Sequence, residues 1–416
     1  MDRVSGAVSV SSAEISAGSS EETSSESFPE SGEEKISSQN DALESAYIDL
    51  TKTTGIKYID VGGSTICTIL DDGSIVLWGT NYNGTVGNGK KYEYIQDDGK
   101  MVPNSSPPFR NAFSSKIVDV ASDICSYALS ENGELYMWGF NYHSTIPLPF
   151  DYMLYPQKIK DVQNVKSVAL STGLCLILDD SGNVYHTGIM IEKFKSPYEY
   201  FSAFDFGELE VHEKFTKIYL DFKCANIYAS PIAYIFLSTE GEVYIQGMID
   251  CSKASGEDNF YFAEPSKLDF PEKITDVAAS AFGIMALSET GGVYIYGTSD
   301  EGLINETLDT KISENIYKKN LDKVKQISAN GDNPFAALTE NGEVYVWGRD
   351  SHGISEYPSE TYVLLDEGKM ISVPVKLDLK NIAQISISEF VGTAIDADGN
   401  VFIWGDNSTN EHIEFK

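Results

Sequence analysis

The side chains best suited to acid–base chemistry or metal binding are few in this sequence and lie far apart. The five histidines are His143, His186, His212, His352 and His412. They form no HExxH motif and no close pair with a cysteine, whereas a zinc site needs several ligands that converge on one point. We therefore interpret them as ordinary loop and strand residues, and we predict neither a metal site nor a cofactor.

The cysteines and the acidic turns need no catalytic or metal-binding role to explain them. An odd number of cysteines cannot all form disulfides, and none of the five belongs to a CxxC motif. The first three lie in apolar runs, where a free cysteine is usually a small buried hydrophobe. Asp396, Asp398 and Asn400 resemble the start of a calcium loop, but Val401 stands where that loop needs glycine. We predict a hairpin turn there.

No local motif points to catalysis. The sequence contains no G-x-S-x-G elbow, no Walker loop and no dinucleotide-binding fingerprint. A repeat fold can still assemble a site from side chains that are distant in sequence, and spacing arguments do not detect such a site. We predict that the protein is not an enzyme, with that alternative left open.

Composition and charge narrow the class of protein further. Of the 416 residues, 42% are hydrophobic, which is enough for a sizeable core, and no apolar stretch reaches the roughly 18 residues of a membrane span. The 63 acidic residues exceed the 30 basic ones and give a net charge of −33. Such a charge repels nucleic-acid phosphates. We predict no membrane span and no nucleic-acid partner.

The start of the chain differs in composition from the rest. Residues 1–46 hold 14 serines and ten acidic side chains but two basic ones, which leaves a charge of −25 for the remainder. So few apolar side chains do not offset the entropy cost of ordering a segment. We predict a disordered acidic tail or linker over 1–45 and a folded domain over 46–416.

The same segment bears on location. It lacks the basic start and the long apolar core of a secretory signal, which taken literally indicates the cytoplasm. A serine- and glutamate-rich spacer before a compact domain is also typical of a surface lipoprotein after removal of its signal and anchor. We favour an extracellular or cell-surface location, with the cytoplasm as the alternative.

Seven copies of one pattern run through the domain, each an apolar run, a polar turn, a glycine and an alternating strand, as in ALTENGEVYVWG at 337–348. Two glycines six residues apart mark every copy. The first glycines are Gly73, Gly133, Gly182, Gly241, Gly291, Gly342 and Gly399, and the second are Gly79, Gly139, Gly188, Gly247, Gly297, Gly348 and Gly405. A glycine that accepts positive φ between such segments indicates a β-hairpin.

Short strand-like segments flank each hairpin. The upstream segments lie at 57–62, 117–122, 165–170, 217–222, 274–279, 324–329 and 382–387. The repeat cores therefore run over 57–79, 117–139, 165–188, 217–247, 274–297, 324–348 and 382–405. Downstream segments follow Pro107, Pro156, Pro265 and Pro374. Four strands per unit, repeated seven times, favour an all-β fold, a seven-bladed β-propeller, with a stacked solenoid as the alternative.

The repeated L-[ST]-x-x-G-x-[VL]-[YF]-x-W-G core resembles the regulator of chromosome condensation (RCC1) repeat over about residues 57–405. The resemblance implies a seven-bladed RCC1-like β-propeller, and the bacterial-type members look most similar. Repeats three and four depart from the pattern, with Thr187 and Gln246 in place of tryptophan. Most repeats also lack the following N-x-x-G-Q-L-G, to which residues 81–87 come nearest.

Two structural roles follow from the repeat positions. The last blade of a ring needs an outermost strand, and we expect residues 47–51 to supply it in preference to residues 413–415. The tryptophans Trp78, Trp138, Trp347 and Trp404 all occupy one repeat position. We therefore interpret them as packing residues within the blades.

Aromatic residues outside the repeat gather in two of the long loops. They are Tyr198, Tyr200, Phe201, Phe204, Phe260 and Tyr261. Aromatic side chains beside acidic ones suit the recognition of a basic protein or a sugar, although loops also bury their own aromatics against a scaffold. We take these residues as the candidate partner-binding site.

The sequence therefore favours a non-enzymatic, monomeric scaffold for protein–protein interaction, whose partner carries a basic surface. The family resemblance implies an alternative, guanine-nucleotide exchange on a small GTPase. Here, however, the tail is acidic where the founding member has a basic arm, and no loop matches its projecting wedge. Binding of glycans or cell wall by the aromatic loops is a further alternative.

Overall fold

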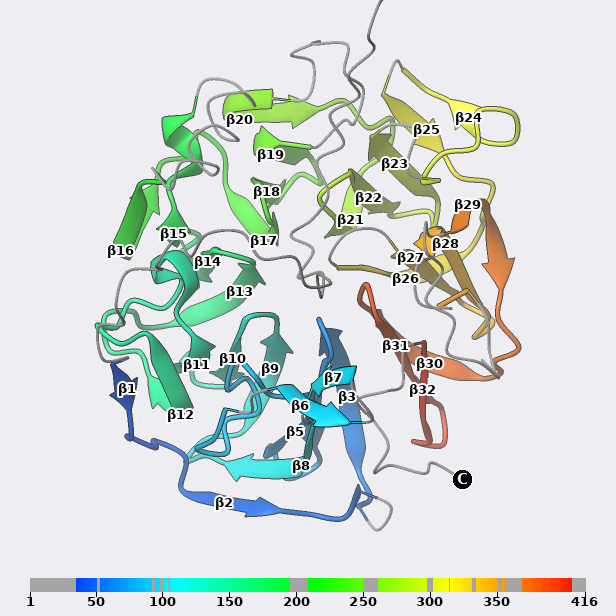
Figure 1. Cartoon of the computed structure of the whole chain (residues 1–416). Coiled ribbons are helices and arrows are strands. Elements are labelled where there is room, and N and C mark those ends of the chain that lie inside the picture. Colours follow the sequence, from blue (N-terminus) through cyan, green and yellow to red (C-terminus); the bar gives the residue numbers. More distant parts are fainter. Residues whose placement is uncertain are drawn as a thin grey trace, which may run out of the picture.

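The computed structural model of the chain describes residues 35–50, 53–91, 94–97, 100–103, 105–194, 209–249, 261–297, 302–313, 315–330, 334–350, 354–355 and 369–405. These residues form a ring of seven β-sheets, each a blade that runs from the centre of the ring to its rim (Figure 1). They contain two short 3-10 turns, η2 (Tyr142–Ser144) and η3 (Ile191–Lys193), and no helix that could cross a membrane. The predicted all-β fold with seven blades is confirmed.

Each blade is a meander of consecutive strands ordered from the centre outwards. Blade one contains β3 (Ile56–Gly62), β4 (Thr65–Leu70), β5 (Ile75–Thr80) and β8 (Ser105–Ala112). Blade two contains β9 (Ile117–Ser122), β10 (Cys125–Ser130), β11 (Leu135–Phe140) and β12 (Tyr152–Lys158). Blade three contains β13 (Val165–Ser171), β14 (Leu174–Asp179), β15 (Val184–Ile189) and β16 (Val211–Ile218). Blade four contains β17 (Cys224–Ser230), β18 (Ala233–Ser238), β19 (Val243–Met248) and β20 (Tyr261–Leu268).

The remaining blades repeat this order with small additions. Blade five contains β21 (Ile274–Ala279), β22 (Gly283–Ser288), β23 (Val293–Gly297) and β25 (Ile316–Lys318), with β24 (Thr310–Lys311) outside it. Blade six contains β26 (Val324–Ala329), β27 (Pro334–Thr339), β28 (Val344–Asp350) and β29 (Lys369–Lys376). The described strands of blade seven are β30 (Ile382–Ile387), β31 (Val391–Asp396) and β32 (Val401–Gly405). A separate hairpin of β6 (Tyr94–Asp97) and β7 (Lys100–Pro103) lies between β5 and β8.

The repeat glycines shape the hairpins and allow the blades to pack. All fourteen have positive φ, from 73° to 159°, which side chains with a Cβ rarely adopt. In the first six blades the first glycine of the hairpin also faces the start of the next blade, whereas a Cβ on Gly399 would meet nothing within 4 Å. A Cβ on Gly342, for example, would lie 2.9 Å from the backbone nitrogen of Ile382. Glycine is therefore needed there for both the turn and the contact between blades.

The core consists of apolar layers between neighbouring blades. The second strands are buried along most of their length because blades cover both of their faces. The repeat tryptophans Trp78, Trp138, Trp347 and Trp404 are among the buried side chains, each with at most 3% of its surface exposed. Burial of tryptophan at this repeated position gives these four blades a similar packing contact with their neighbours.

The sequence places the inner strand of repeat four at 217–222, and this prediction is wrong. Residues 211–218 form β16, the outermost strand of blade three, whereas the inner strand of blade four is β17. Tyr219, in the connection between them, is 83% exposed. The alternating pattern of KIYLDF includes the end of β16, and the true inner strand begins with Cys224 where the other six inner strands begin with isoleucine or valine.

Residues 35–47 form a strap along the rim, and we call this segment the rim strap. Its first strand, β1 (Ile36–Ser37), pairs in parallel with β12 at the edge of blade two. Its second strand, β2 (Glu44–Tyr47), pairs with β8 at the edge of blade one (Figure 1). The structure therefore differs from the predicted tail boundary at residue 45. Residues 1–34 of the predicted tail lie outside the described residues.

The predicted use of residues 47–51 as the outermost strand of blade seven is wrong. Tyr47 ends β2 on blade one, and the amide of Ile48 donates to the Pro108 carbonyl of the same blade at 3.0 Å. Leu50 is buried and packs in the apolar layer between blades one and seven. The first and last blades are joined at their inner strands, where Ser386 accepts a hydrogen bond from the Val61 amide.

Candidate functional site

The two faces of the ring differ in the variability of their connections. One face carries the seven hairpin turns, each with the first glycine of its repeat, together with the links between blades. We call it the turn face. The opposite face, which we call the loop face, carries the segments that join the third strand of each blade to its outermost strand. These segments range from residues 141–151 in blade two to residues 81–104 in blade one. Variable loops on a rigid scaffold are where binding sites usually lie.

The loops of the loop face start in a repeated way. The side chain of Asn81 accepts a hydrogen bond from the Val86 amide at 2.9 Å, and Asn141 accepts one from the Ile146 amide at 2.8 Å. Asp350 accepts one from the Ile354 amide at 2.8 Å. A short side chain that binds an amide a few residues ahead fixes a tight first turn. The loops therefore leave the blades in defined directions.

The residue at the tryptophan position of the next blade holds this first turn from the side. The indole of Trp138 donates to the Thr85 carbonyl at 2.6 Å, and the indole of Trp404 donates to the Ile354 carbonyl at 2.9 Å. Thr187, which replaces tryptophan in repeat three, still donates to a carbonyl of the preceding loop, at 2.7 Å. The departure from the repeat pattern therefore keeps the bond and changes only the packing volume.

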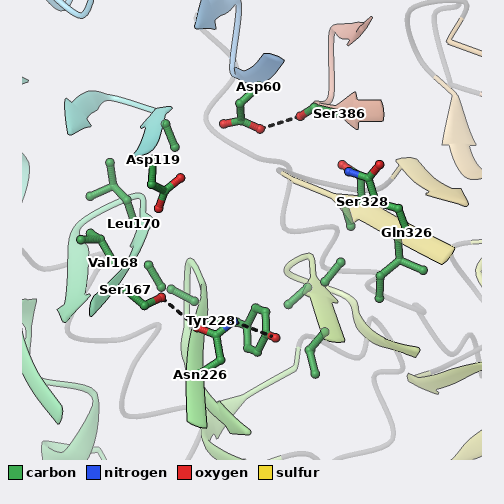
Figure 2. A pocket seen from close by; sticks show the side chains of 18 of the residues that line it. Asp60, Asp119, Ser167, Val168, Leu170, Asn226, Tyr228, Gln326, Ser328 and Ser386 are labelled. Atoms are coloured by element: carbon green, nitrogen blue, oxygen red, sulfur yellow. Dashed lines mark hydrogen bonds between the residues drawn. The ribbon is translucent and has the colours of Figure 1, made fainter. Parts of the chain in front are cut away.

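The inner strands line a central channel that encloses a cavity of about 380 Å³. The residue that follows the β-bulge of each inner strand is polar in all seven blades, and we call this set the channel ring. Its members are Tyr58, Asp119, Ser167, Asn226, Asp276, Gln326 and Gln384. Ser167 donates to Asn226 of the next blade at 2.8 Å (Figure 2). Tyr228 donates to Asp276 of the blade after that at 2.9 Å.

Burial raises the pKa of carboxyl groups in and near the channel. Burial raises the pKa of Asp60 to about 6, even though the Ser386 hydroxyl donates to it at 2.6 Å. Burial also raises the pKa of Asp119, which accepts from the Tyr127 hydroxyl at 2.9 Å. The described residues that line the cavity include no histidine, lysine or arginine. Such a lining does not suit anions, and its polar atoms serve mainly to bind one blade to the next.

The turn face is uniform in charge as well as in structure. Every hairpin turn presents at least one exposed acidic side chain, and together these are Asp72, Glu131, Asp180, Glu240, Glu289, Glu340 and Asp398. An acidic residue just after the glycine forms an ion pair with a lysine of the outermost strand in several blades, as between Glu242 and Lys267 at 2.8 Å. A surface that repeats from blade to blade offers a partner no distinctive patch, so it is poorly suited to specific binding.

The predicted aromatic binding residues are only partly described. Tyr198, Tyr200, Phe201, Phe204 and Phe260 lie outside the described residues, in the segments that join β15 to β16 and β19 to β20. Both segments start and end on the loop face. Tyr261 begins β20, pairs with Met248 and packs against the apolar layer between blades three and four. It is therefore a blade residue.

The structure assembles one group of side chains that the sequence did not reveal. His186 and His212 approach each other with Glu192 in blade three, although the histidines lie far apart in the sequence. His186 stands at a repeat position that is apolar in the six other copies, and this substitution was the available sequence signal. His143, in η2, is not a member of this group. The turn at Asp396 is a hairpin turn, closed by its bonds to the Asp398 and Asn400 amides.

These features define a seven-bladed β-propeller with a uniform turn face and a variable loop face. Comparisons with known proteins define its kind. A model of the regulator of chromosome condensation (RCC1) repeat matches residues 324–354. The human regulator of chromosome condensation is 31% identical over 156 residues, 36% of this chain and 35% of that protein. The Arabidopsis thaliana mitochondrial RCC1 domain-containing protein RUG3 is 24% identical over 295 residues, 67% of this chain and 62% of that protein.

Solved structures agree on the fold. Human WBSCR16 superposes with a TM-score of 0.61 at 18% identity, over 81% of this chain and 89% of that one. Yeast RCC1 (Prp20), solved with Kap60, superposes with a TM-score of 0.59 at 19% identity, over 80% of this chain and 78% of that one. The chain is therefore an RCC1-like β-propeller, and it spans less than two thirds of the length of the two curated relatives named above.

Proposed function

We propose that this propeller is a non-enzymatic interaction module that binds a protein partner with its loop face. The observation that carries the proposal is the contrast between the two faces. Connections that vary in length and sequence all emerge on the loop face, and their first turns are fixed by Asn81, Asn141 and Asp350. A preorganised surface lowers the entropy cost of binding.

Charge supports a partner with a basic surface. The chain carries −33 overall, and the acidic excess is not confined to its first residues. Complementary charge accelerates association and makes it sensitive to salt. We therefore expect a complex whose formation slows as ionic strength rises. A solved yeast relative is described by its binding to Gsp1p and histones, and another complex holds Kap60. Those partners are partners of the yeast protein. They support the proposal that the ligand of this chain is also a protein.

The test compares the two faces in the full chain. The chain is used to capture partners from extracts of the source cells at low and raised salt, and each captured protein is purified for binding measurements. The double variant Tyr200→Ala/Phe201→Ala changes a loop-face segment, and Glu289→Lys/Glu340→Lys changes the turn face by the same number of residues. We expect the first to weaken binding at least tenfold, as for interface hot spots, and the second to have a much smaller effect. The reverse result contradicts the proposal.

Guanine-nucleotide exchange is the second candidate function, because the aligned human relative is a regulator of chromosome condensation. Its measurement is the release of labelled nucleotide from a purified small GTPase with and without the full chain. Release accelerated by the chain would assign exchange. Glycan binding is distinguished in the capture experiment, because polysaccharide retained on the chain would be lost in Tyr200→Ala/Phe201→Ala without any protein partner.

Location and oligomeric state belong to the same proposal. We propose an extracellular or cell-surface location and a monomer, on the composition of the first 45 residues and the closed ring. Protease digestion of intact cells measures the location, since a surface protein is cut while a cytoplasmic one is protected. Light scattering of the purified chain measures its mass directly.

A further inference from the structure

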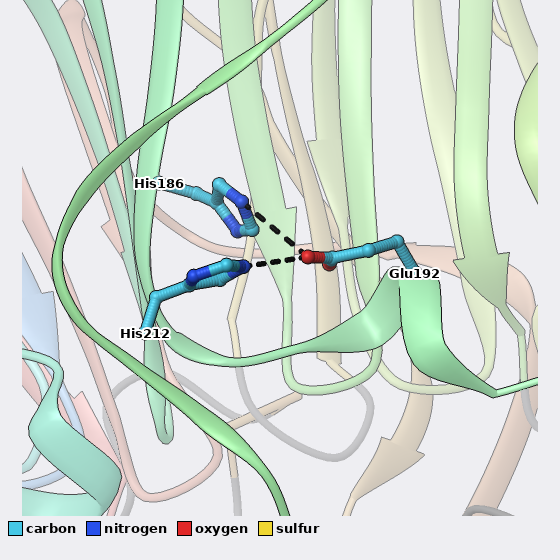
Figure 3. Close-up of side chains that lie close together, drawn as sticks. All are labelled: His186, Glu192 and His212. Carbon is cyan, nitrogen blue, oxygen red and sulfur yellow. Dashed lines mark hydrogen bonds and ion pairs between the residues drawn. The ribbon is translucent and has the colours of Figure 1, made fainter.

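Two histidines and a glutamate converge at the edge of blade three. His186 lies in β15, His212 in the neighbouring strand β16, and Glu192 in the 3-10 turn η3 that follows β15. The ring centroids of the two imidazoles are 4.3 Å apart, and one ligand atom from each of the three residues lies within 4.8 Å of the others (Figure 3). The group is close to the loop face, and Glu192 is exposed.

A histidine at this position should destabilise the fold unless its ring nitrogens have partners. The six equivalent residues of the other repeats are Leu77, Met137, Ile245, Ile295, Val346 and Ile403. An apolar side chain there packs between blades, and His186 is buried to the same degree, with 3% of its surface exposed. Burial of an imidazole is unfavourable unless both ring nitrogens are engaged.

The Nδ1 atom of His186 is fully engaged by the next blade. It lies 2.7 Å from the hydroxyl of Tyr234, a buried residue of β18. That hydroxyl donates its proton to the Ile189 carbonyl at 3.0 Å. The hydroxyl oxygen therefore accepts from Nδ1–H of the imidazole, and we assign the proton of the neutral ring to Nδ1. The Nε2 atom then carries a lone pair directed towards Glu192.

The same logic applies to His212. Its Nδ1 atom lies 3.1 Å from the Thr216 hydroxyl, and this hydroxyl donates to the Lys214 carbonyl at 3.2 Å. Nδ1–H is therefore a donor here too. A donor at Nδ1 with a free Nε2 is the usual arrangement of a histidine that ligates a metal, because the outer partner fixes the tautomer and the ring orientation.

Three acceptor atoms consequently face one another. The Oε1 atom of Glu192 is 2.6 Å from Nε2 of His212 and 3.7 Å from Nε2 of His186. A proton on His212 would satisfy its own contact with the carboxylate but would leave Nε2 of His186 without a hydrogen-bond donor among the described residues. One cation satisfies all three atoms. A tetrahedral zinc site with bonds of about 2.0–2.1 Å holds its ligand atoms about 3.3–3.4 Å apart, a value that lies between the two separations from Glu192.

We propose that His186, Glu192 and His212 bind a divalent transition-metal ion, with Zn²⁺ as the best match to two imidazoles and one carboxylate. Three protein ligands leave the fourth position open to water or to a group of a binding partner. The ion would tie η3 to β15 and β16 at the root of the blade-three loop. The hydrogen bond that His186 donates to Tyr234 extends this link to blade four.

The first experiment titrates the metal-free full chain with Zn²⁺ in a calorimeter. We expect one saturable site of 1:1 stoichiometry, and visible absorption bands of a low-coordinate ion when Co²⁺ is used in place of Zn²⁺. His186→Ile restores the residue type of the sister repeats, so the fold is retained while a ligand is lost. We expect this variant and His212→Gln to lose affinity by more than the about 10–100-fold that removal of an outer-shell partner causes.

Two further variants make the test specific. Tyr234→Phe keeps the ring but removes the hydroxyl, and we expect it to weaken Zn²⁺ binding by about 10–100-fold. His143→Gln is the matched control and is expected to bind normally, because His143 lies outside the group. Absence of saturable binding by the unsubstituted chain overturns the proposal. So does a folded His186→Ile or His212→Gln variant that binds Zn²⁺ with unchanged affinity.

Discussion

The side-chain amide of Gln384, in the last blade, forms two hydrogen bonds with the backbone of Ile59, in the first. The Ile59 amide donates to Oε1 of Gln384 at 3.3 Å, and Nε2 of Gln384 donates to the Ile59 carbonyl at 3.3 Å. Gln326 makes the same pair of bonds with Ile385 across the preceding seam, at 3.0 and 2.8 Å. The junction between residues distant in sequence thus copies a junction between consecutive blades.

Gln384→Ala should therefore weaken the ring at its closing seam. The substitution leaves an amide and a carbonyl of Ile59 without this partner, and we expect the free energy of unfolding to fall by about 1–3 kcal/mol. Urea denaturation measures it. Gln326→Ala is the matched control. We expect Gln326→Ala to raise the unfolding rate less than Gln384→Ala does, because the chain still links blades six and seven directly. Equal unfolding rates for the two variants would show that the closing seam is not the weaker one.

Asp60 and Asp72 should affect stability with opposite dependence on pH. The pKa of Asp60 is raised from 3.8 to about 6 by burial, so the folded state binds more protons than the unfolded state between pH 4 and 6. Stability contributed by this group is therefore lost as pH rises through that window. Asp60→Asn should flatten the decline and add about 1–3 kcal/mol of stability at pH 7.

The matched variant is Asp72→Asn. Hydrogen bonds from Ser74 lower the pKa of Asp72, and the Arg110 guanidinium adds to this effect. The ionised form is thus favoured in the folded state, and its contribution is lost as pH falls through the folded pKa. Asp72→Asn should slightly destabilise the protein at neutral pH and have a smaller effect in acid. Thermal melts from pH 3 to 8 compare both variants, and effects of the same sign at pH 7 would contradict the assignment.

Lys319 and Asp309 form a buried ion pair that holds a loop of blade five. Their charged atoms are 2.9 Å apart, with side-chain exposures of 0% and 2%. Lys319 also donates to the carbonyls of Leu303 and of Ser372 in blade six. Lys319→Met leaves a buried carboxylate without its cation, and we expect a loss of about 3–5 kcal/mol in the free energy of unfolding. Adding Asp309→Asn should recover part of it, and a double variant less stable than the single one would contradict this account.

Substitutions at two repeat glycines should distinguish the energetic cost of backbone strain from the cost of a steric clash between blades. Gly342 and Gly399 have similar φ values, 75° and 85°. A Cβ at Gly342 would meet the backbone of Asn381 and Ile382 at 2.9–3.1 Å, whereas a Cβ at Gly399 would meet nothing within 4 Å. Gly399→Ala should cost about 1–2 kcal/mol, the strain of a left-handed residue. Gly342→Ala should cost about 1–3 kcal/mol more because of the clash, and equal losses in urea denaturation would contradict this view.

The regular part of the fold was accessible from the sequence because its determinants are local. A glycine between an apolar run and an alternating strand specifies a hairpin, and the constant interval between Gly342 and Gly348 fixes its register. The inner strand of blade four was misplaced because it begins with Cys224, where the other six begin with isoleucine or valine, while the end of β16 and the residues after it alternate as an inner strand does. The rim strap was missed because its strands are short and gain their stability from blades whose positions depend on the whole ring.

The candidate metal site could not be derived from spacing. His186 and His212 are 26 positions apart in sequence, and they meet because β15 and β16 are paired while η3 brings Glu192 back towards them. The polar residue at an apolar repeat position was visible, yet its partners depend on strand register. The aromatic candidates Tyr200 and Phe201 remain a prediction, since they lie outside the described residues.

The path of the rim strap determines how the ring is presented to its surroundings. Lys35, where the described chain begins, hydrogen-bonds to Asp151 next to β12, so the polypeptide enters at the outer edge of blade two. It then passes around blade one before it turns inwards to β3. Anything attached ahead of Lys35 pulls on the edge of the disc. An attachment there would leave both the loop face and the turn face accessible, because the strap runs along the rim between them.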